Sequence, residues 1–325
     1  MKFIFFGTNI FSGTVFDSLS AHGYAPEAII TVPDDVAGRK QVLTPPHIKE
    51  KCAGSGIHIA QYSSLKDPET RKKIASFGAD FAIVAAYRKI IPQAVLDMFP
   101  NGVLDVHPSL LPKWRGPSPI ESAISAGDTE TGVSIILLDA DMDHGPIILQ
   151  EKTDIGSDEY FEDVYGRLAR MGGAMLLKLI PQWLDGKIEP KEQDHTRATF
   201  SKMLSWKDGK VDPGQSVSEI YNRIRAFACE PGCWMEPEQK SESGKDKAER
   251  FILKIFRAKP AIGDGIGVSS NGKGPGLCEI GKQLYLICKD GALVLEQVQP
   301  QGKRVMSGIE FLNGYRKKIQ VRLFE

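Results

Sequence analysis

The stretch DFAIVAAYRKIIPQAVLDMFPNGVLDVH, residues 80–107, decides the fold. It opens and closes with short apolar runs at 80–86 and 103–107, and a helix-length segment separates the two runs. Continuous apolar runs of this length, without the alternation of a half-exposed strand, are typical of strands that are buried on both faces. The stretch therefore predicts two strands of a parallel sheet that is covered by helices.

Similar patterns extend on both sides of this stretch. Strands are predicted at 2–6, 27–32, 57–60 and 132–139, and helices at 11–20 and 158–184. The alternation of strands and helices predicts a doubly wound, Rossmann-like α/β domain over residues 1–188. Its first turn, GTNIFSG (7–13), lacks the G-x-G-x-x-G spacing of a dinucleotide-binding loop, so a tight strand-to-helix turn is favoured over a nucleotide site.

The C-terminal third of the chain has a different pattern. Residues 186–213 lose hydrophobic periodicity and gain Gly, Pro and charge, which predicts a linker at 189–205. An amphipathic helix is predicted next at 216–227, then four strands at 250–259, 276–280, 283–290 and 292–300. Short strands at this spacing with Gly-rich turns predict that residues 206–325 form a small β-barrel of the oligonucleotide-binding (OB-fold) kind.

The composition is that of an ordinary globular protein, with 325 residues of which 42% are hydrophobic and 25% charged. Every apolar run is far shorter than the ~20 residues that cross a bilayer, so we expect a cytoplasmic protein without a membrane partner. The five cysteines are scattered and form no C-x-x-C pair, which argues against both disulfides and a metal site.

The net charge of zero conceals an asymmetry between the two predicted domains. Residues 206–325 carry 20 basic and 15 acidic side chains, a net charge of +5, so residues 1–205 carry −5. A basic C-terminal part is consistent with a polyanionic partner, although a charge of this size more often marks only a soluble surface.

Polar side chains follow the strand at 103–107. Asp105 and His107 are two residues apart, so they point to one face at the carboxyl end of the strand, where open α/β sheets bind ligands. The next predicted strand ends in LLDADMDHG (137–145). If the two strands are neighbours, a carboxylate of this turn can orient and charge His107 as an acid/base group. The alternative, given equal weight, is that His107 caps a strand and the aspartates only form a turn.

Longer motifs then identify a resemblance that covers nearly the whole chain. They are FFGTNIFS (5–12), IVAAYRKIIP (83–92), DVHPSLLPKWRGPSPI (105–120), GDTETGVSIILLDADMDHGPII (127–148), QDHTRATFSKMLSWKDGKVD (193–212) and QPQGKRVMSGIEFLNGYR (299–316). Together they resemble the methionyl-tRNA formyltransferase family. The S-L-L-P and D-x-G segments also occur in formyltransferases of sugars, purine precursors and folate, whereas the last two motifs narrow the resemblance to the tRNA enzymes.

The resemblance implies transfer of a formyl group from 10-formyltetrahydrofolate to the α-amine of methionine on initiator tRNA, by a monomer and without a metal. The family's catalytic trio falls on Asp105, His107 and Asp143. The implied folate-binding residues are Ala86, Tyr87, Arg88, Ser109, Leu110, Leu111 and Pro112. The implied tRNA-binding residues are Arg39, Lys40, Lys303, Arg304, Arg316, Lys317 and Lys318.

Asp105 departs from the family, which has Asn at this position. An amide donates a hydrogen bond to a developing oxyanion, whereas an ionised carboxylate only accepts, and loss of such a donor costs roughly 10²–10³ in rate. The chain is therefore expected to be severely impaired unless Asp105 is protonated. Three accounts stay open: a natural variant that uses a neutral acid, an inactive relative that binds tRNA or folate, and an engineered substitution.

Two further departures concern the ligand-binding segments. Arg88 stands where the family usually has Gly, which predicts a local adjustment of the backbone beside the folate. Gln41 and Val42 replace part of a more basic family loop, so tRNA binding is expected to depend more on the C-terminal barrel.

Overall fold

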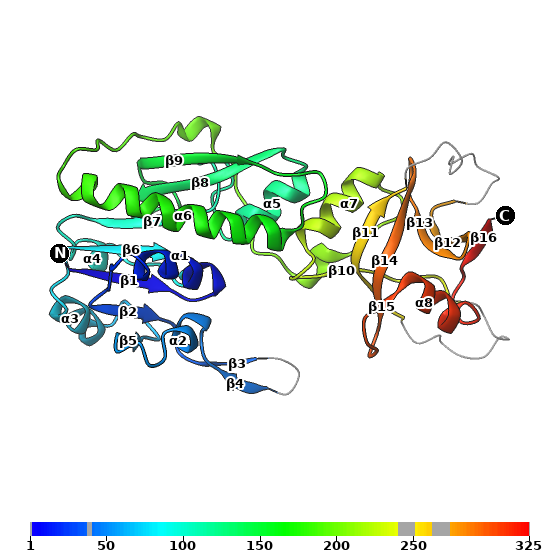
Figure 1. The fold of residues 1–325 in the computed structure, drawn as a ribbon, viewed down its shortest axis with the longest axis horizontal. Helices are drawn as coiled ribbons and strands as arrows, with labels where there is room; N and C mark the ends of the chain where they lie inside the picture. The colour runs from blue at the N-terminus through cyan, green and yellow to red at the C-terminus, as the bar shows by residue number, and fades with distance from the viewer. Residues whose placement is uncertain (1, 38–40, 240–250, 262–273, 325) are drawn as a thin grey trace. The chain divides into compact units, whose positions relative to one another are not determined.

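The computed structural model describes residues 2–37, 41–239, 251–261 and 274–324 (Figure 1). Its contacts divide the chain into two compact units. The N-terminal unit comprises 1–120, 130–154 and 163–202, and the C-terminal unit comprises 121–129, 155–162 and 203–325. The predicted succession of 1–188, 189–205 and 206–325 is simpler than this division, because two early segments belong to the C-terminal unit and most of the predicted linker belongs to the N-terminal unit.

The N-terminal unit is built on a seven-stranded sheet with the order β5-β2-β1-β6-β7-β8-β9. The strands are β1 (Phe3–Gly7), β2 (Ala28–Thr31), β5 (His58–Gln61), β6 (Phe81–Ala85), β7 (Val103–His107), β8 (Glu130–Leu137) and β9 (Ile147–Asp154). The first five pair in parallel, and the central β1, β6 and β7 are buried along their whole length, which explains their continuous apolar sequences. The Rossmann-like prediction is confirmed.

The direction of β8 differs from the prediction. The strand predicted at 132–139 was expected to extend the parallel sheet, but β8 runs antiparallel to β7, with Leu137 opposite Leu104 and Ser134 opposite His107. β9, which was not predicted, runs antiparallel to β8, and its burial alternates because one of its faces is exposed. The end of β8 therefore lies beside the start of β7, away from His107.

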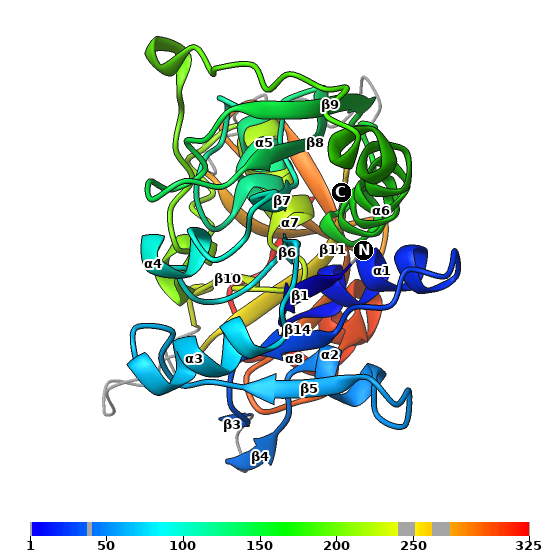
Figure 2. The same ribbon diagram turned by 90° about the vertical axis from the view of Figure 1, so that its left-hand side faces the viewer.

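Helices cover both faces of this sheet. They are α1 (Ile10–Ser20), α2 (His47–Lys51), α3 (Pro68–Ser76), α4 (Gln93–Leu96) and α6 (Phe161–Leu184). Figure 2 shows α1 and α6 on one face and α3 and α4 on the other. α6 packs closely against β7 and α1 because residues 172 and 173 are glycines. A Cβ at Gly172 would collide with Val106, and one at Gly173 would collide with Ser18 of α1. Since Val106 faces α6, its neighbours Asp105 and His107 face the opposite side of the sheet.

A small hairpin, β3 (Asp35–Ala37) paired with β4 (Val42–Thr44), follows β2. Arg39 and Lys40, which were predicted to contact tRNA, lie outside the described residues.

The C-terminal unit contains a second sheet, with the order β10-β11-β14-β13-β12-β16 and with β15 paired to β14. The strands are β10 (Cys233–Met235), β11 (Leu253–Pro260), β12 (Gly276–Ile280), β13 (Gln283–Ile287), β14 (Ala292–Pro300), β15 (Met306–Ser307) and β16 (Arg322–Phe324). An isolated bridge between Gln239 and Ile319 joins the chain after β10 to the chain before β16, so the two edges of the sheet meet. The four predicted strands are present, and β10, β15 and β16 are additional.

The helices of this unit are α7 (Val217–Ala226) and α8 (Gly308–Tyr315), while α5 (Pro119–Ala126) lies at the start of its first segment. Both α7 and α8 begin with a Ser/Glu capping box, which satisfies the first amide groups of each helix. The early segment 155–162 packs into the unit through Tyr160, whose hydroxyl donates to the carbonyl of Ala258 at 3.0 Å and accepts from its amide at 3.1 Å.

Among the helices of the described ranges, none has the length and hydropathy that crossing a membrane requires.

Candidate active site

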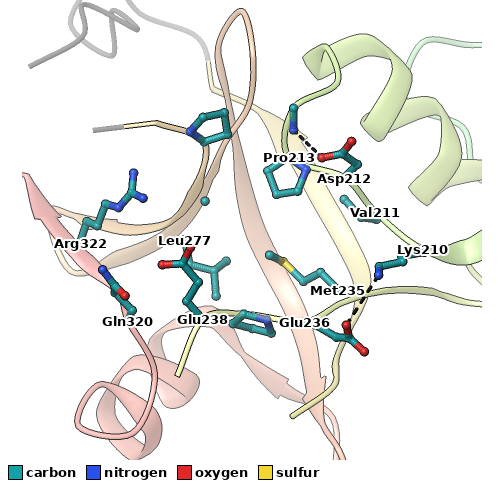
Figure 3. Close-up of a pocket in the computed structure, with 14 residues that line it drawn as sticks. Lys210, Val211, Asp212, Pro213, Met235, Glu236, Glu238, Leu277, Gln320 and Arg322 are labelled. Atoms are coloured by element: carbon teal, nitrogen blue, oxygen red, sulfur yellow. Dashed lines mark hydrogen bonds and ion pairs between the residues drawn. The ribbon is translucent and has the colours of Figure 1, made fainter. Parts of the chain in front are cut away.

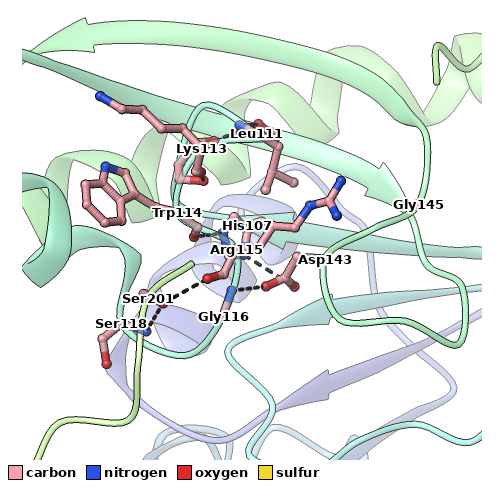
Figure 4. Close-up of polar contacts among 12 residues, drawn as sticks. His107, Leu111, Lys113, Trp114, Arg115, Gly116, Ser118, Asp143, Gly145 and Ser201 are labelled. Carbon is pink, nitrogen blue, oxygen red and sulfur yellow. Dashed lines mark hydrogen bonds and ion pairs between the residues drawn. The ribbon is translucent and has the colours of Figure 1, made fainter. Parts of the chain in front are cut away.

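Strand β7 presents Asp105 and His107 on one face, and both side chains are buried, with 8% and 5% exposure. His107 Nε2 lies 3.1 Å from the carbonyl oxygen of Trp114 (Figure 4). Because a carbonyl oxygen only accepts, Nε2 must carry a proton and donate it. Nδ1 then faces the other way, 3.6 Å from Oδ1 of Asp143.

Asp143 reaches His107 through a loop that folds back, because the end of β8 lies at the wrong end of β7. The Asp143 backbone has a positive φ of 51°, and its Oδ2 accepts a hydrogen bond from the amide of Gly116 at 2.6 Å. Gln193 Nε2 donates to the carbonyls of Asp143 and Gly145, at 2.9 and 2.7 Å. A Cβ at Gly145 would collide with the carbonyl oxygen of Leu137, so this turn requires glycine.

The other two aspartates of the loop have a structural role. Asp139 accepts from the amide of Asp141 at 3.0 Å and from Nδ1 of His144 at 2.7 Å. The His144 ring stacks on His195, with 4.0 Å between the ring centroids. Asp139 and Asp141 form the turn, as one interpretation of this segment expected. Asp143 faces His107, as the other interpretation expected for one carboxylate of the turn.

The loop that follows β7 is tied to the neighbouring strands. Ser109 Oγ donates to the carbonyl of Lys113 at 2.6 Å, and Ser134 Oγ on β8 donates to the carbonyl of Ser109 at 2.6 Å. The Leu111 amide donates to Ser134 Oγ at 3.1 Å, and Gln150 of β9 donates to the Leu111 carbonyl at 3.0 Å. Of the predicted folate-binding residues, Ser109 and Leu111 are buried in this loop, and Leu110 and Pro112 are half-buried.

Part of the predicted linker forms another side of the site. Arg115 is buried at 4% exposure, and its guanidinium donates to Oε1 of Gln193 at 2.7 Å and contacts Nδ1 of His195 at 2.8 Å. The Arg115 amide donates to the carbonyl of Thr199 at 2.9 Å, and the Ser201 amide donates to the carbonyl of Arg115 at 2.7 Å. Arg115 and Gln193 were not predicted as site residues. Their only sequence signal was their place in the W-R-G and Q-D-H motifs.

Asp105 differs from its two partners because no side chain in the described part of the chain donates a hydrogen bond to it. Burial first, and then the negative charge of Asp143, raise the pKa of the Asp105 carboxyl well above its ordinary value. The ligating atoms of Asp105, His107 and Asp143 all lie within 4.8 Å of one another. The structure therefore brings the predicted catalytic trio together.

The segment after β6 lies where the two halves of the sheet diverge, between β1 and β6, which is the usual ligand site of such sheets. Ala86 has a positive φ of 46°, and the Arg88 amide donates to Oγ1 of Thr8 at 3.3 Å. The ring of Tyr87 packs against Phe6 at 5.4 Å, and burial raises the pKa of its hydroxyl to about 12. That hydroxyl is buried without a hydrogen-bond partner among the described residues. Arg88 has no positive φ, so its replacement of Gly does not strain the backbone.

The predicted tRNA-binding residues of the C-terminal unit are all exposed. Arg304 pairs with Glu310 at 3.2 Å, and Arg316 pairs with the buried Glu279. Lys303, Lys317 and Lys318 have no acidic partner within the described ranges.

Arg223 and Arg225 of α7 hydrogen-bond to backbone carbonyls within the C-terminal unit. Arg225 is buried and donates to the carbonyls of Gly156 and Glu159, at 3.1 and 2.8 Å. Arg223 donates to the carbonyl of Lys210 at 3.0 Å.

A pocket in the C-terminal unit contains none of the predicted site residues (Figure 3). Its charged lining residues are Lys210, Asp212, Glu236, Glu238 and Arg322, and Lys210 pairs with Glu236 at 3.6 Å. With three acidic and two basic side chains, this pocket has no excess of positive charge that would attract a phosphate.

Each of the two parts of the chain matches a known protein family. Residues 1–180 match the formyl transferase family, and residues 203–316 match the formyl transferase C-terminal domain. The methionyl-tRNA formyltransferase of Chloroflexus aurantiacus is 35% identical over 97% of both chains. That of Myxococcus xanthus is 33% identical over 89% of this chain and 87% of its own.

Solved structures are similar in fold at lower identity. An N-formyltransferase from Helicobacter canadensis, in complex with folinic acid and dTDP-3-aminofucose, has a TM-score of 0.63 at 16% identity and covers 91% of this chain and 98% of its own. HypX from Aquifex aeolicus, in complex with tetrahydrofolic acid, has a TM-score of 0.64 at 14% identity and covers 100% of this chain and 49% of its own. From the two domain matches and the full-length relatives, the chain belongs to the methionyl-tRNA formyltransferase family.

Proposed function

We propose that the chain transfers the formyl group of 10-formyltetrahydrofolate to the α-amine of methionine charged on initiator tRNA. The observation that carries this proposal is the cluster formed by the buried Asp105 and His107 at the carboxyl end of β7 and the half-buried Asp143, which faces them from the loop after β8. Relatives at 35% identity over nearly the full chain, named methionyl-tRNA formyltransferases, support the choice of acceptor.

His107 handles the proton that the attacking amine must lose. Its Nε2 hydrogen is fixed on the Trp114 carbonyl, so Nδ1 is the nitrogen that accepts this proton. The imidazolium that results faces Asp143 Oδ1 at 3.6 Å, and the carboxylate stabilises its charge. As the bond between N10 of the folate and the formyl carbon breaks, the imidazolium returns the proton to N10, and tetrahydrofolate leaves. The hydrogen bond from Gly116 to the other oxygen of Asp143 keeps that carboxylate oriented.

Asp105 replaces the amide of the family only in its neutral form. A protonated carboxyl can donate a hydrogen bond to the formyl oxygen as negative charge develops there, whereas an ionised carboxylate repels that charge. Burial and the neighbouring Asp143 favour the protonated form, because both raise the pKa of Asp105. The chain is therefore active through a neutral acid, with a rate that declines where Asp105 ionises.

The folate co-substrate fits beside this trio. The segment Ala86–Arg88 follows β6 and the loop Ser109–Pro112 follows β7, and these two strands are adjacent and parallel. The Tyr87 hydroxyl, buried without a described partner, offers a hydrogen-bonding group at this position. The co-substrate supplies the formyl group, and these two segments hold and orient it.

The tRNA is bound electrostatically by the C-terminal unit. Lys303, Lys317 and Lys318 are exposed cations without acidic partners in the described part of the chain, and Arg304 and Arg316 lie beside them in sequence. Arg39 and Lys40 are proposed to add contacts to the tRNA from the N-terminal part of the chain. These substrates belong to the cytoplasm, where we expect the chain to act as a monomer.

The test is an acceptor comparison with the full-length protein and labelled 10-formyltetrahydrofolate. Charged initiator methionyl-tRNA is expected to accept label, whereas the same tRNA without methionine and a nucleotide-linked amino sugar are not. Label on the sugar alone would instead support a sugar formyltransferase. Folate binding without transfer to any acceptor, by both the parent and Asp105→Asn, would support the inactive relative.

A further inference from the structure

When Asp105 loses its proton, three hydrogen-bond acceptors converge at the end of β7 without a donor side chain between them. Because Nε2 of His107 donates to the Trp114 carbonyl, the neutral imidazole directs the lone pair of Nδ1 toward Asp143. The Asp105 carboxyl lies in the same space, with all three ligating atoms within 4.8 Å. Such an arrangement is stabilised by a positive charge placed among the three groups.

The Asp105 side chain gives an independent indication of a ligand. It is 8% exposed, so it is cut off from bulk water, and no described side chain hydrogen-bonds to it. The backbone amide of Val106 is the hydrogen-bond partner that the described residues offer this carboxyl. A buried carboxylate supported by one backbone amide is costly, and a proton or a bound cation compensates its charge.

The remaining polar atoms of the other two groups are already held by the main chain. The Nε2–H group of His107 donates a hydrogen bond to the Trp114 carbonyl, and Oδ2 of Asp143 accepts one from the Gly116 amide at 2.6 Å. Metal-binding histidines and carboxylates are oriented by outer hydrogen bonds of this kind. The site therefore contains ligand atoms and also the contacts that orient them.

We propose that Asp105, Asp143 and Nδ1 of His107 bind a divalent transition-metal cation, with Zn²⁺ as the preferred ion. One imidazole nitrogen and two carboxylates favour Zn²⁺ over Mg²⁺ or Ca²⁺, which prefer all-oxygen sites. Two atoms bound at ~2.1 Å to one ion lie at most about 4.2 Å apart. The His107–Asp143 pair, at 3.6 Å, already meets this limit, and a small rotation of the Asp105 carboxyl completes the set.

This site depends on the residue by which the chain departs from its family. With Asn at position 105 the set would keep one anionic ligand instead of two. A bound cation would also occupy Nδ1 of His107 and so inhibit formyl transfer. This last consequence rests on the proposed function, whereas the binding itself does not.

The test measures binding directly on the full-length protein after treatment with a chelator. Zn²⁺ titration by calorimetry is expected to give one ion per chain, and Co²⁺ is expected to give the intense visible absorption of a four- or five-coordinate ion. Asp105→Asn should weaken Zn²⁺ binding by at least ~10²-fold, which exceeds the cost of changing an outer hydrogen-bond partner. Thermal unfolding of the metal-free variant checks that it is folded.

The matched control is His22→Ala, which removes an exposed imidazole that contacts the Ser18 carbonyl on another part of the N-terminal unit. This variant is expected to keep the parent's affinity. Equal affinity of Asp105→Asn and parent, or loss of binding in His22→Ala, would overturn the proposed site. If Zn²⁺ binds as expected but formyl transfer is unaffected by it, the site stands and the assigned role of His107 fails.

Discussion

The two regions proposed to act on substrate are built in opposite ways. At the end of β7 the side chains are buried, and Trp114, Gly116 and Gln193 fix the groups around them. On the C-terminal unit, Lys303, Lys317 and Lys318 are exposed and unpaired among the described residues. In the first region, a single substitution that removes one functional group is expected to abolish most of the activity. The second acts as a sum of charges, so a single substitution there is expected to have little effect.

The largest effect is expected for His107→Gln. Glutamine keeps a polar side chain but cannot take up the amine proton, so the rate constant for formyl transfer should fall by roughly 10²–10⁴. Single-turnover transfer with charged initiator tRNA measures this, and tRNA affinity serves as the control because it should be unchanged. A reduction below tenfold would mean that the buried site does not depend on this atom.

Asp105→Asn is expected to change activity in the other direction. Where Asp105 is ionised, the amide should raise the rate by roughly 10²–10³, because it restores a donor. Burial and Asp143 raise the folded-state pKa of Asp105, so the parent should lose activity as pH rises through that value, and the variant should not. Rate against pH for the two proteins is the measurement, and a variant that is no faster at any pH would refute the donor argument.

The same raised pKa predicts a stability difference. A group whose pKa is higher in the folded state contributes stability that is complete below its unfolded pKa, about 3.9 for Asp, and lost as pH rises through the folded value. Asp105→Asn lacks this loss, so its melting temperature should exceed that of the parent at high pH. The difference should disappear below about pH 4.

The sequence predicts those parts of the fold and the site that depend on neighbouring residues, and it does not predict those that depend on contacts between distant residues. The direction of Asp105 and His107 depends only on the two-residue period of a strand, and the apolar runs specify β1, β6 and β7. The antiparallel direction of β8 could not be predicted, because strand direction depends on tertiary packing. The return of Asp143 to His107 depends on Gln193, 50 residues later, and no local pattern encodes that contact.

Gln193→Ala tests whether this distant contact matters for the buried site. The substitution removes the hydrogen bonds to the carbonyls of Asp143 and Gly145 and leaves Arg115 without its amide partner. A displaced Asp143 should lower the rate constant by up to ~10²-fold, since small errors in position are costly in catalysis. Gln193→Glu, which can still accept from Arg115, separates the two contacts. Parental activity in Gln193→Ala would show that the loop holds Asp143 without this support.

The smallest effect per residue is expected on the C-terminal unit. Replacement of Lys303, Lys317 and Lys318 with Ala should weaken tRNA binding and reduce its salt slope by about one for each phosphate that is no longer neutralised. Arg316 is left intact because its removal would strand the buried Glu279. The matched control replaces three exposed lysines of the N-terminal unit, Lys66, Lys72 and Lys73, and should leave the slope unchanged. Equal slopes for the two triple variants would remove the C-terminal lysines from the interface.

The early segment 155–162 has a consequence for how the protein could be rearranged in evolution or in the laboratory. Arg225 binds two carbonyls of this segment, and Arg257 lies over the Tyr160 ring, 3.8 Å from its centroid. A gene fragment that encodes only 206–325 would produce a C-terminal unit without these partners. The C-terminal unit is therefore not encoded by one continuous stretch of the gene. A chimera that receives this unit must also receive residues 155–162, or another aromatic side chain that packs against Arg257.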